Sequence, residues 1–172
     1  MQSIGIIGVS IIVAIAYGAI HDQITARICI EYFTIGHSPL INSNSPTVVG
    51  LVWGIVATWW VGLLLGTGLA ITARFGKRPK LTISQLLRSI GYLLCGMLGV
   101  AILAGAVGFV LASTGAVFLL EPIASQIPPQ KHVAYLVNLW AHTASYLSGL
   151  AGGLRLWIVT WRRRGKLYAR AH

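Results

Sequence analysis

The sequence has very few acidic residues and few charges of any kind. Only three of its 172 residues are Asp or Glu, and charged residues make up 9% of the chain. A soluble domain carries about a quarter charged residues, so this chain cannot cover a water-facing surface. The shortage of charge therefore excludes an ordinary soluble domain and predicts a protein whose surface faces lipid.

The chain also lacks the motifs of several common chemistries. It has two cysteines, Cys29 and Cys95, and neither belongs to a CxxC or haem-attachment pattern. We expect Cys29 on the outer side and Cys95 within the membrane, too far apart for a disulfide. No nucleotide-binding loop, Gly-x-Ser-x-Gly or His-Glu-x-x-His motif occurs. The sequence therefore gives no support for the enzyme classes that these motifs mark.

Four long stretches of the chain carry no charged residue. Residues 4–20, 47–73, 89–120 and 132–154 contain no Asp, Glu, Lys or Arg. Crossing a bilayer takes roughly 20 such residues, and runs of this length are helical because lipid offers the backbone no hydrogen bonds. We predict an all-α, single-domain integral membrane four-helix bundle with spans at about 4–20, 47–73, 86–112 and 132–158. The outer loops are then 21–46 and 113–131, the cytoplasmic loop is 74–85, and the basic tail is 159–172.

One uncharged stretch is longer than a span requires. Residues 89–120 would form a helix of roughly 48 Å, against a hydrocarbon core of ~30 Å. The helix must tilt, break near residues 113–115, or continue along the outer surface. At its start, Thr82 and Gln85 have the spacing of a capping box.

The positive charges are concentrated at two places. The formal net charge is +10. Most Lys and Arg residues flank the link between the second and third spans or follow the fourth: Arg74, Lys77, Arg78, Lys80, Arg88, Arg155, Arg162, Arg163, Arg164, Lys166 and Arg170. The positive-inside rule places both clusters, and both chain ends, in the cytoplasm. We interpret the clusters as anchors to anionic lipid at the cytoplasmic face of the bilayer and expect no nucleic-acid partner.

The first span also has a feature of a signal peptide. Ala14-Ile15-Ala16 has the small-x-small form of a cleavage site, whereas the preceding "MQS" lacks the basic residue that such peptides carry. The missing basic residue indicates that the first span is not cleaved. With or without cleavage, residues 21–46 emerge on the outer face.

Small residues recur every four positions in three spans. The second span carries Gly50, Gly54, Gly62 and Gly66, and the third and fourth spans contribute Gly108 and Gly149. Bilayer helices associate through close backbone contact, which small residues allow. We expect these stripes to pack the helices of one chain together. Contact with a membrane-protein partner or a second copy is the alternative.

Metal-ligating residues gather on the expected outer side. They are His21, Asp22, Glu31, His37, Glu121 and His132. Mixed histidine and carboxylate ligands suit iron, zinc or manganese. One hypothesis is therefore a metal site at the outer surface, supported by Gln23, Thr25 or Tyr32.

The other interpretation of this segment is a helix extension that serves as a linker. If the first helix continues through residue 32, Asp22 and Glu31 face opposite ways with about 14 Å of helix axis between them. They could not share an ion, and Arg27 and Glu31 would form an ordinary surface pair. We favour this interpretation because no clear helix breaker precedes Gly36.

A polar stripe in the fourth span offers a separate candidate. His142 lies ten residues into that span, near mid-membrane, with Asn138 and Tyr146 one turn away on either side. Ionisable groups at such depth are often proton relays or ligands. We expect no acidic partner at that depth, which favours a neutral, hydrogen-bonded histidine. Haem is not expected, because no other span has a mid-membrane histidine to serve as a second axial ligand.

Three passages of the sequence are similar to those of a protein group. "HDQITARICIEYFTIGH", "ATWWVGLLLG" and "ARFGKRPKLT" resemble small bacterial integral membrane proteins of unknown activity, mainly over residues 16–90. The resemblance implies a bacterial cytoplasmic membrane protein. It implies no activity, cofactor or catalytic residue.

Three functions remain open from the sequence. The favoured hypothesis is a non-enzymatic packing or accessory membrane protein. The second is a metal-dependent membrane enzyme, an oxidoreductase or a hydrolase, that uses the outer His and carboxylate group. The third is a small carrier with His142 in its path, which ranks last because the inverted repeats and broken helices of such carriers are missing.

Overall fold

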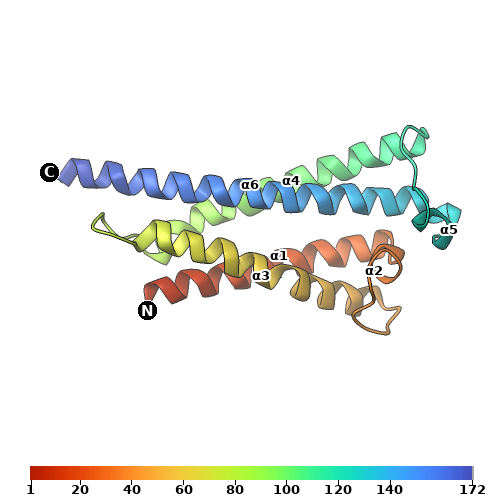
Figure 1. Cartoon of the computed structure of the whole chain (residues 1–172), viewed down its shortest axis with the longest axis horizontal. Coiled ribbons are helices and arrows are strands. Elements are labelled where there is room, and N and C mark those ends of the chain that lie inside the picture. The colour runs from red at the N-terminus through yellow and green to blue at the C-terminus, as the bar shows by residue number, and fades with distance from the viewer. Residues whose placement is uncertain (172) are drawn as a thin grey trace.

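The computed structural model describes residues 1–171, which contain helices and no strand. The elements in order are α1 (Gln2–Ile28), α2 (Glu31–Thr34), α3 (Pro46–Arg74), α4 (Ile83–Ser113), α5 (Ile123–Gln126), η1 (Pro129–Lys131) and α6 (His132–Ala171). Helices α1, α3, α4 and α6 are long and lie side by side (Figure 1). The prediction of an all-α protein is confirmed over these residues.

Three of the long helices are apolar enough to cross a membrane. They are α1, α3 and α4. Four spans were predicted, but α6, although it has 40 residues, does not reach the same apolarity. Its first half carries His132, Asn138 and His142, and its last turns are strongly basic. Composition and length therefore support three spans.

The two ends of the molecule differ in charge. The N- and C-termini lie at one end, together with the loop between α3 and α4 (Figure 1). We call this the basic end, because the sequence beside it includes Arg74, Arg78 and residues 162–166. The opposite end holds the short helices α2 and α5, and we call it the α2 end.

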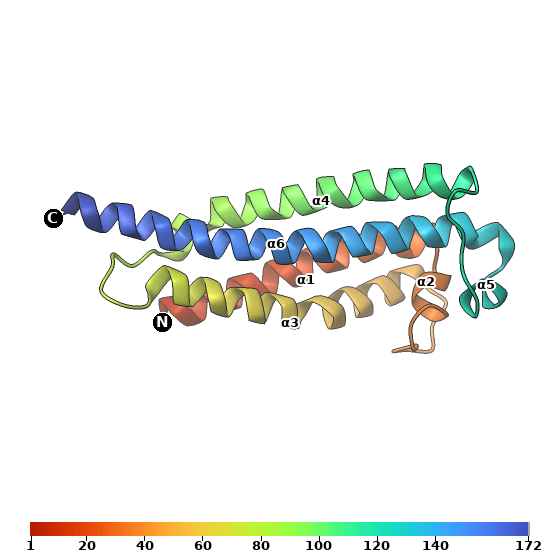
Figure 2. The ribbon, with the colours of Figure 1, turned by 45° about the horizontal axis from the view of Figure 1, so that its top comes forward.

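The long helices form two closely packed pairs. Helix α1 packs along α3 and α4 along α6, whereas contacts between the pairs are far fewer and come mainly from α3 and α6 (Figure 2). A Cβ atom added to Gly54 would lie 2.5 Å from Ala19 Cα, and one added to Gly62 would lie 2.7 Å from Ile11 Cα. The glycine stripe of α3 therefore contacts the α1 backbone directly.

The second pair uses its glycines differently. A Cβ atom at Gly108 of α4 would lie 2.9 Å from Trp140 Cγ, and one at Gly149 of α6 would lie 2.9 Å from Met97 Cε. These glycines make room for large side chains of the neighbouring helix. The α4–α6 pair is thus held by side chains in gaps, and the α1–α3 pair by backbone contact.

Helix α4 has the boundaries that its sequence signals indicate. At its start, Gln85 Oε1 accepts a hydrogen bond from the Thr82 backbone N at 2.9 Å. At its end, the helix stops at Ser113, and Gly115 takes a φ of +73°, a left-handed conformation that favours glycine. The long uncharged stretch therefore breaks at 113–115.

The linker interpretation expected α1 to continue through residue 32, but the helix ends earlier. It ends at Ile28, and Cys29 is extended, with φ −155° and ψ 100°. The chain then turns into α2, whose Tyr32 and Phe33 are buried against Val49 of α3 and Tyr135 of α6. Burial of two aromatic side chains outweighs the local preference for a longer helix.

A buried arginine ties the basic end together. Arg164 of α6 has no exposed surface. Its guanidinium donates to the carbonyl oxygens of four residues near the end of α3 at 2.7–2.9 Å, namely Thr72, Phe75, Arg78 and Pro79. The last carbonyls of a helix lack partners within it, so this side chain satisfies the end of α3 and fixes it to α6.

Candidate metal centre between α1 and α6

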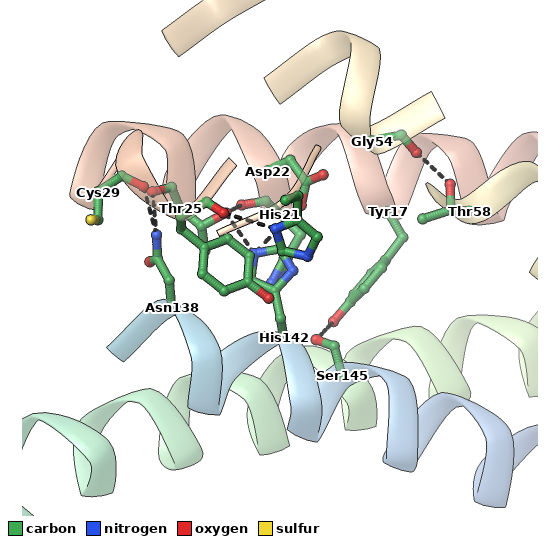
Figure 3. Close-up of polar contacts among 12 residues, drawn as sticks. Tyr17, His21, Asp22, Thr25, Cys29, Gly54, Thr58, Asn138, His142 and Ser145 are labelled. Atoms are coloured by element: carbon green, nitrogen blue, oxygen red, sulfur yellow. Dashed lines mark hydrogen bonds and ion pairs between the residues drawn. The ribbon is translucent and has the colours of Figure 1, made fainter. Parts of the chain in front are cut away.

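Three buried side chains that can bind metal converge near the α2 end. They are His21 and Asp22 of α1 and His142 of α6, and one ligand atom from each lies within 4.8 Å of the others. His142 Nε2 is 3.8 Å from Asp22 Oδ1, and the two imidazole rings meet edge to face at 4.5 Å (Figure 3). Their exposed fractions are only 5–8%. We call this group the His–Asp cluster.

The helical periodicity of α1 explains why two neighbours in sequence both face inward. The buried residues in this half of the helix are Gly18, His21, Asp22, Thr25 and Ala26. Spacings of three and four residues lie on one face of a helix. Gly18 and Gly54 bring α1 and α3 together on this side. His21 and Asp22 therefore continue the packed face of α1.

One buried amide side chain ties α6 to the end of α1. Asn138 Nδ2 donates to Thr25 O at 2.8 Å and to Cys29 O at 3.1 Å. Thr25 lies in the last turn of α1, and Cys29 directly follows the helix. His142 follows Asn138 by one turn and is thereby set beside His21 and Asp22.

Thr25 also holds the imidazole of His142. Its hydroxyl donates to His21 O at 3.1 Å, so the hydroxyl oxygen is free to accept from His142 Nε2–H, which is 3.1 Å away. This bond selects one tautomer of His142. A side chain of α1 thus orients a side chain of α6.

Aromatic rings cover the cluster. Tyr32 stacks on His142 with ring centroids 4.6 Å apart, and Phe33 approaches the same ring at 5.5 Å. On the other side, Tyr17 stacks on His21 at 5.8 Å. Burial raises the pKa of Tyr32 well above its ordinary value, with smaller effects from Tyr135, Tyr146 and Asp22. Its hydroxyl therefore stays neutral, and the two α2 side chains that cover the cluster, Tyr32 and Phe33, carry no charge.

Two buried polar atoms at this place have no hydrogen-bond partner among the described residues. They are His21 Nε2 and Asn138 Oδ1. Leaving such an atom unpaired costs about 1–3 kcal/mol. Because His21 Nε2 lies in the His–Asp cluster, this cost falls on an atom that is a good metal ligand.

A cavity adjoins the cluster. Its volume is about 110 Å³, and all four long helices contribute to its wall. The His–Asp cluster lines it together with Tyr17, Ser145 and Tyr146. The Tyr17 hydroxyl and the Ser145 hydroxyl are hydrogen-bonded at 2.8 Å (Figure 3). The cluster is therefore buried but faces a space inside the bundle.

The other metal-ligand candidates from the sequence do not join the cluster. Glu31 accepts a hydrogen bond from Cys29 Sγ at 3.2 Å, and His37 Nδ1 lies 2.8 Å from Tyr32 O. Glu121 accepts from the backbone N of Ser125 at 3.1 Å. His132 Nε2 lies 2.9 Å from Ile127 O. These four residues have local partners, as the linker interpretation requires.

The residues expected to support a metal site are also divided. Thr25 and Tyr32 contact His142, whereas Gln23 donates to Thr47 O at 2.8 Å, away from the cluster. The expected surface pair of Arg27 and Glu31 is absent from the described residues. Because α1 ends at Ile28, the i to i+4 geometry is lost, and Arg27 donates to Gln23 and Thr47 instead.

The expectation that His142 has no acidic partner was wrong. Asp22 lies 3.8 Å from it. The expectation assigned His21 and Asp22 to an outer loop, whereas α1 continues for two more turns and buries both. The spacing of Gly18, His21, Asp22 and Thr25 could have revealed this, since it continues the inner face of the helix. Tyr146 lines the cavity, one turn beyond His142.

Comparisons of the chain with protein-family models, with curated proteins and with solved structures found no match.

Proposed function

We propose that this chain is a multi-pass membrane protein that binds one divalent transition-metal ion, zinc or ferrous iron, in the His–Asp cluster. Two observations carry the proposal: one ligand atom each of His21, Asp22 and His142 lies within 4.8 Å of the others, and the buried Nε2 of His21 has no hydrogen-bond partner among the described residues. An ion at this point would give the orphaned nitrogen a partner. It would also neutralise the buried carboxylate.

The ligand set favours a reactive site over a structural one. Two imidazole nitrogens and one carboxylate oxygen form the donor set of many zinc hydrolases and non-haem iron oxidoreductases. Structural zinc sites are closed by four protein ligands, whereas catalytic sites keep a position open. Three protein ligands beside a cavity match the second arrangement. We therefore propose a metal-dependent membrane enzyme of the hydrolase or oxidoreductase class.

The residues around the cluster would support such an ion. His142 would present Nε2 once its proton moves to Nδ1, which exchanges the bond to Thr25 for a bond to the metal. Tyr32 and Phe33 would limit access of water from the α2 end. Asn138 would hold α6 in position through Thr25 O and Cys29 O.

The proposed setting is the bacterial cytoplasmic membrane. Helices α1, α3 and α4 are long and apolar enough to cross it, and α6 packs along α4 as the proposed fourth span. Asn138, His142 and Ser145 of α6 are buried, and they contact α1 or line the cavity. The positive-inside rule then places the basic end in the cytoplasm, against anionic lipid.

Elemental analysis of untagged protein in mild detergent tests the proposal. We expect one zinc or iron per chain, and loss of that metal in His21→Ala and in His142→Ala. His37→Ala and His132→Ala are the controls, because both histidines lie outside the cluster and have local partners. Equal metal content in all four variants would exclude the cluster as the site.

A thermal shift measurement provides an independent test. A ligand present at 100 times its Kd stabilises the folded state by about 2.7 kcal/mol. We expect zinc or ferrous iron to raise the Tm of metal-stripped protein and of the His37→Ala control, but not of Asp22→Asn. Metal-free wild-type protein with no shift would contradict the proposal and leave the accessory-protein hypothesis.

A further inference from the structure

The cavity beside the His–Asp cluster extends along the helices. Ser10 and Asp22 both line it, and they are twelve residues apart in α1, which corresponds to about 18 Å of helix axis. The cavity lies between the α1–α3 pair and the α4–α6 pair, where contacts between helices are fewest. Its shape is therefore long and narrow, and it runs along the membrane-spanning direction.

The wall of this cavity is polar at one end and apolar at the other. Toward the α2 end it presents the His–Asp cluster and the hydroxyl groups of Tyr17, Ser145 and Tyr146. Toward the basic end it presents Leu65, Leu94 and Leu156. Ser10 adds little polarity there, because its hydroxyl donates to Ile6 O at 2.8 Å. The cavity thus matches a molecule with one polar head and one apolar chain.

The charge at the polar end selects the sign of that head. Among the residues that line the cavity, Asp22 is the one carboxylate, and no Lys or Arg is present. With a divalent cation bound, the cluster would carry a net charge of +1. A buried net charge is costly unless it is paired. An anionic, oxygen-bearing head would neutralise the site and fill an open metal position.

We propose that the ligand of this site is a single-chain membrane amphiphile with a carboxylate head, that is, a long-chain fatty acid. This inference rests on the proposed metal site. The carboxylate lies at the His–Asp cluster and the chain follows the cavity toward Leu156. A two-chain phospholipid is the alternative occupant, and the labelling experiment below distinguishes the two. The route from the bilayer would pass between α1 and α4, which make few contacts with each other.

Photocrosslinking in native membranes tests the proposal. The probe is a long-chain fatty acid that carries a diazirine at mid-chain, and adducts are mapped by mass spectrometry of peptides. We expect adducts on cavity residues such as Val13 and Met97, and at least tenfold fewer there with the methyl ester of the same probe. A phospholipid that carries the same chain should also label the cavity poorly. Equal cavity labelling by the methyl ester or the phospholipid would overturn the carboxylate assignment.

Two matched pairs of variants locate the chain. Val13→Trp and Met97→Trp place bulk in the cavity, while Ile12→Trp and Leu98→Trp place the same bulk on neighbouring lipid-facing positions, where Ile12 is 66% exposed and Leu98 is 40% exposed. We expect the first member of each pair to lose at least nine-tenths of the cavity adducts and the second to keep them. Loss in both members, or in neither, would overturn the proposal.

Metal content measured on the same samples separates the two proposals. Metal retained in Val13→Trp or Met97→Trp, with adducts lost, supports the fatty acid and shows that the variant is folded. Metal present in the wild type without specific cavity adducts overturns the fatty acid alone. A wild type that never holds metal overturns the proposed function and the charge argument with it.

Discussion

Buried polar side chains occur at both ends of the molecule, but their surroundings differ. At the basic end, Arg164 has no exposed surface, and four backbone carbonyl oxygens accept hydrogen bonds from it. At the α2 end, the His–Asp cluster is almost as buried, yet His21 Nε2 has no partner among the described residues. Arg164 is a structural group whose interactions are complete. The cluster has unused bonding capacity, which our proposal assigns to a metal ion.

The difference follows from the backbone that each group meets. Arg164 reaches the end of α3, where unpaired carbonyls are abundant and the negative end of the helix dipole attracts a cation. A guanidinium has five N–H donors and suits that environment. His21 instead faces Asp22, His142 and a mostly apolar cavity, where protein acceptors and donors are few. The four predictions below test this contrast, in order of decreasing effect.

Removal of the arginine should have the largest effect on folding. Arg164→Met leaves four carbonyl oxygens without their donor, so we expect the free energy of unfolding to fall by about 3 kcal/mol or more. Unfolding in mixed micelles with increasing SDS measures this. Arg163→Met is the control, because Arg163 is exposed and, among the described residues, donates a single hydrogen bond, to Gln85 O at 3.1 Å. Equal losses in both variants would mean that Arg164 has no special structural role.

A methyl group added at the α1–α3 contact should displace the part of α1 that carries the His–Asp cluster. A Cβ atom at Gly50 would lie 2.7 Å from Asp22 O, so Gly50→Ala must push the α1 backbone away. Such overpacking costs about 1–3 kcal/mol. We expect that loss of stability together with weaker zinc binding, measured by SDS titration and metal competition. Gly99→Ala, where no atom lies within 4 Å of the added Cβ, should be neutral or slightly stabilising.

Substitution of His21 should separate stability from metal binding. His21→Leu removes the unpartnered nitrogen, so we expect metal-free protein to be unchanged or more stable by up to about 1 kcal/mol. The stabilisation by added metal should disappear in the same variant. Comparison of Tm with and without zinc measures both effects. A large loss of stability without metal would show that His21, like Arg164, is a structural residue.

The smallest effect concerns the reactivity of a thiol under α2. Cys29 is 1% exposed, and burial together with the hydrogen bond and negative charge of Glu31 raises the pKa of its thiol to about 11. In a Cys95→Ser background, maleimide labelling at pH 7–8 should be slow and should rise roughly tenfold per pH unit toward pH 11. Glu31→Gln removes the charge, lowers this pKa and should increase the rate without affecting stability. Rapid labelling at neutral pH would show that α2 does not cover Cys29.

The sequence contained strong information on the helices and on their contact faces. Charge-free runs indicated α1, α3 and α4, and a break of α4 near 113–115 was one of the three outcomes that its length allowed. The stripe of Gly50, Gly54, Gly62 and Gly66 indicated a packing face, which lies against α1. These features are local. The geometry of a single α-helix fixes both the spacing of residues on one face and the length that a run of residues spans.

The candidate site was only half visible in the sequence. His21, Asp22 and His142 were all named as candidates, but they were assigned to two different sites. The end of α1 at Ile28 depends on burial of Tyr32 and Phe33 by other helices, and no residue near Cys29 signals it. Without knowing where α1 ends, the sequence could not show that His21 and His142 lie at the same depth along the bundle.

The amino-acid sequence by itself determined that the chain has helices apolar enough to cross a bilayer and which faces carry small residues, since these follow from hydropathy and period. Only the tertiary structure decided that Asp22 meets His142, and that Arg164 is satisfied while His21 is not. The bonds responsible join distant residues: Asn138 to Thr25 spans 113 positions, and His142 to Thr25 spans 117. Long-range hydrogen bonds have no sequence period, because they depend on how two complete helices lie against each other.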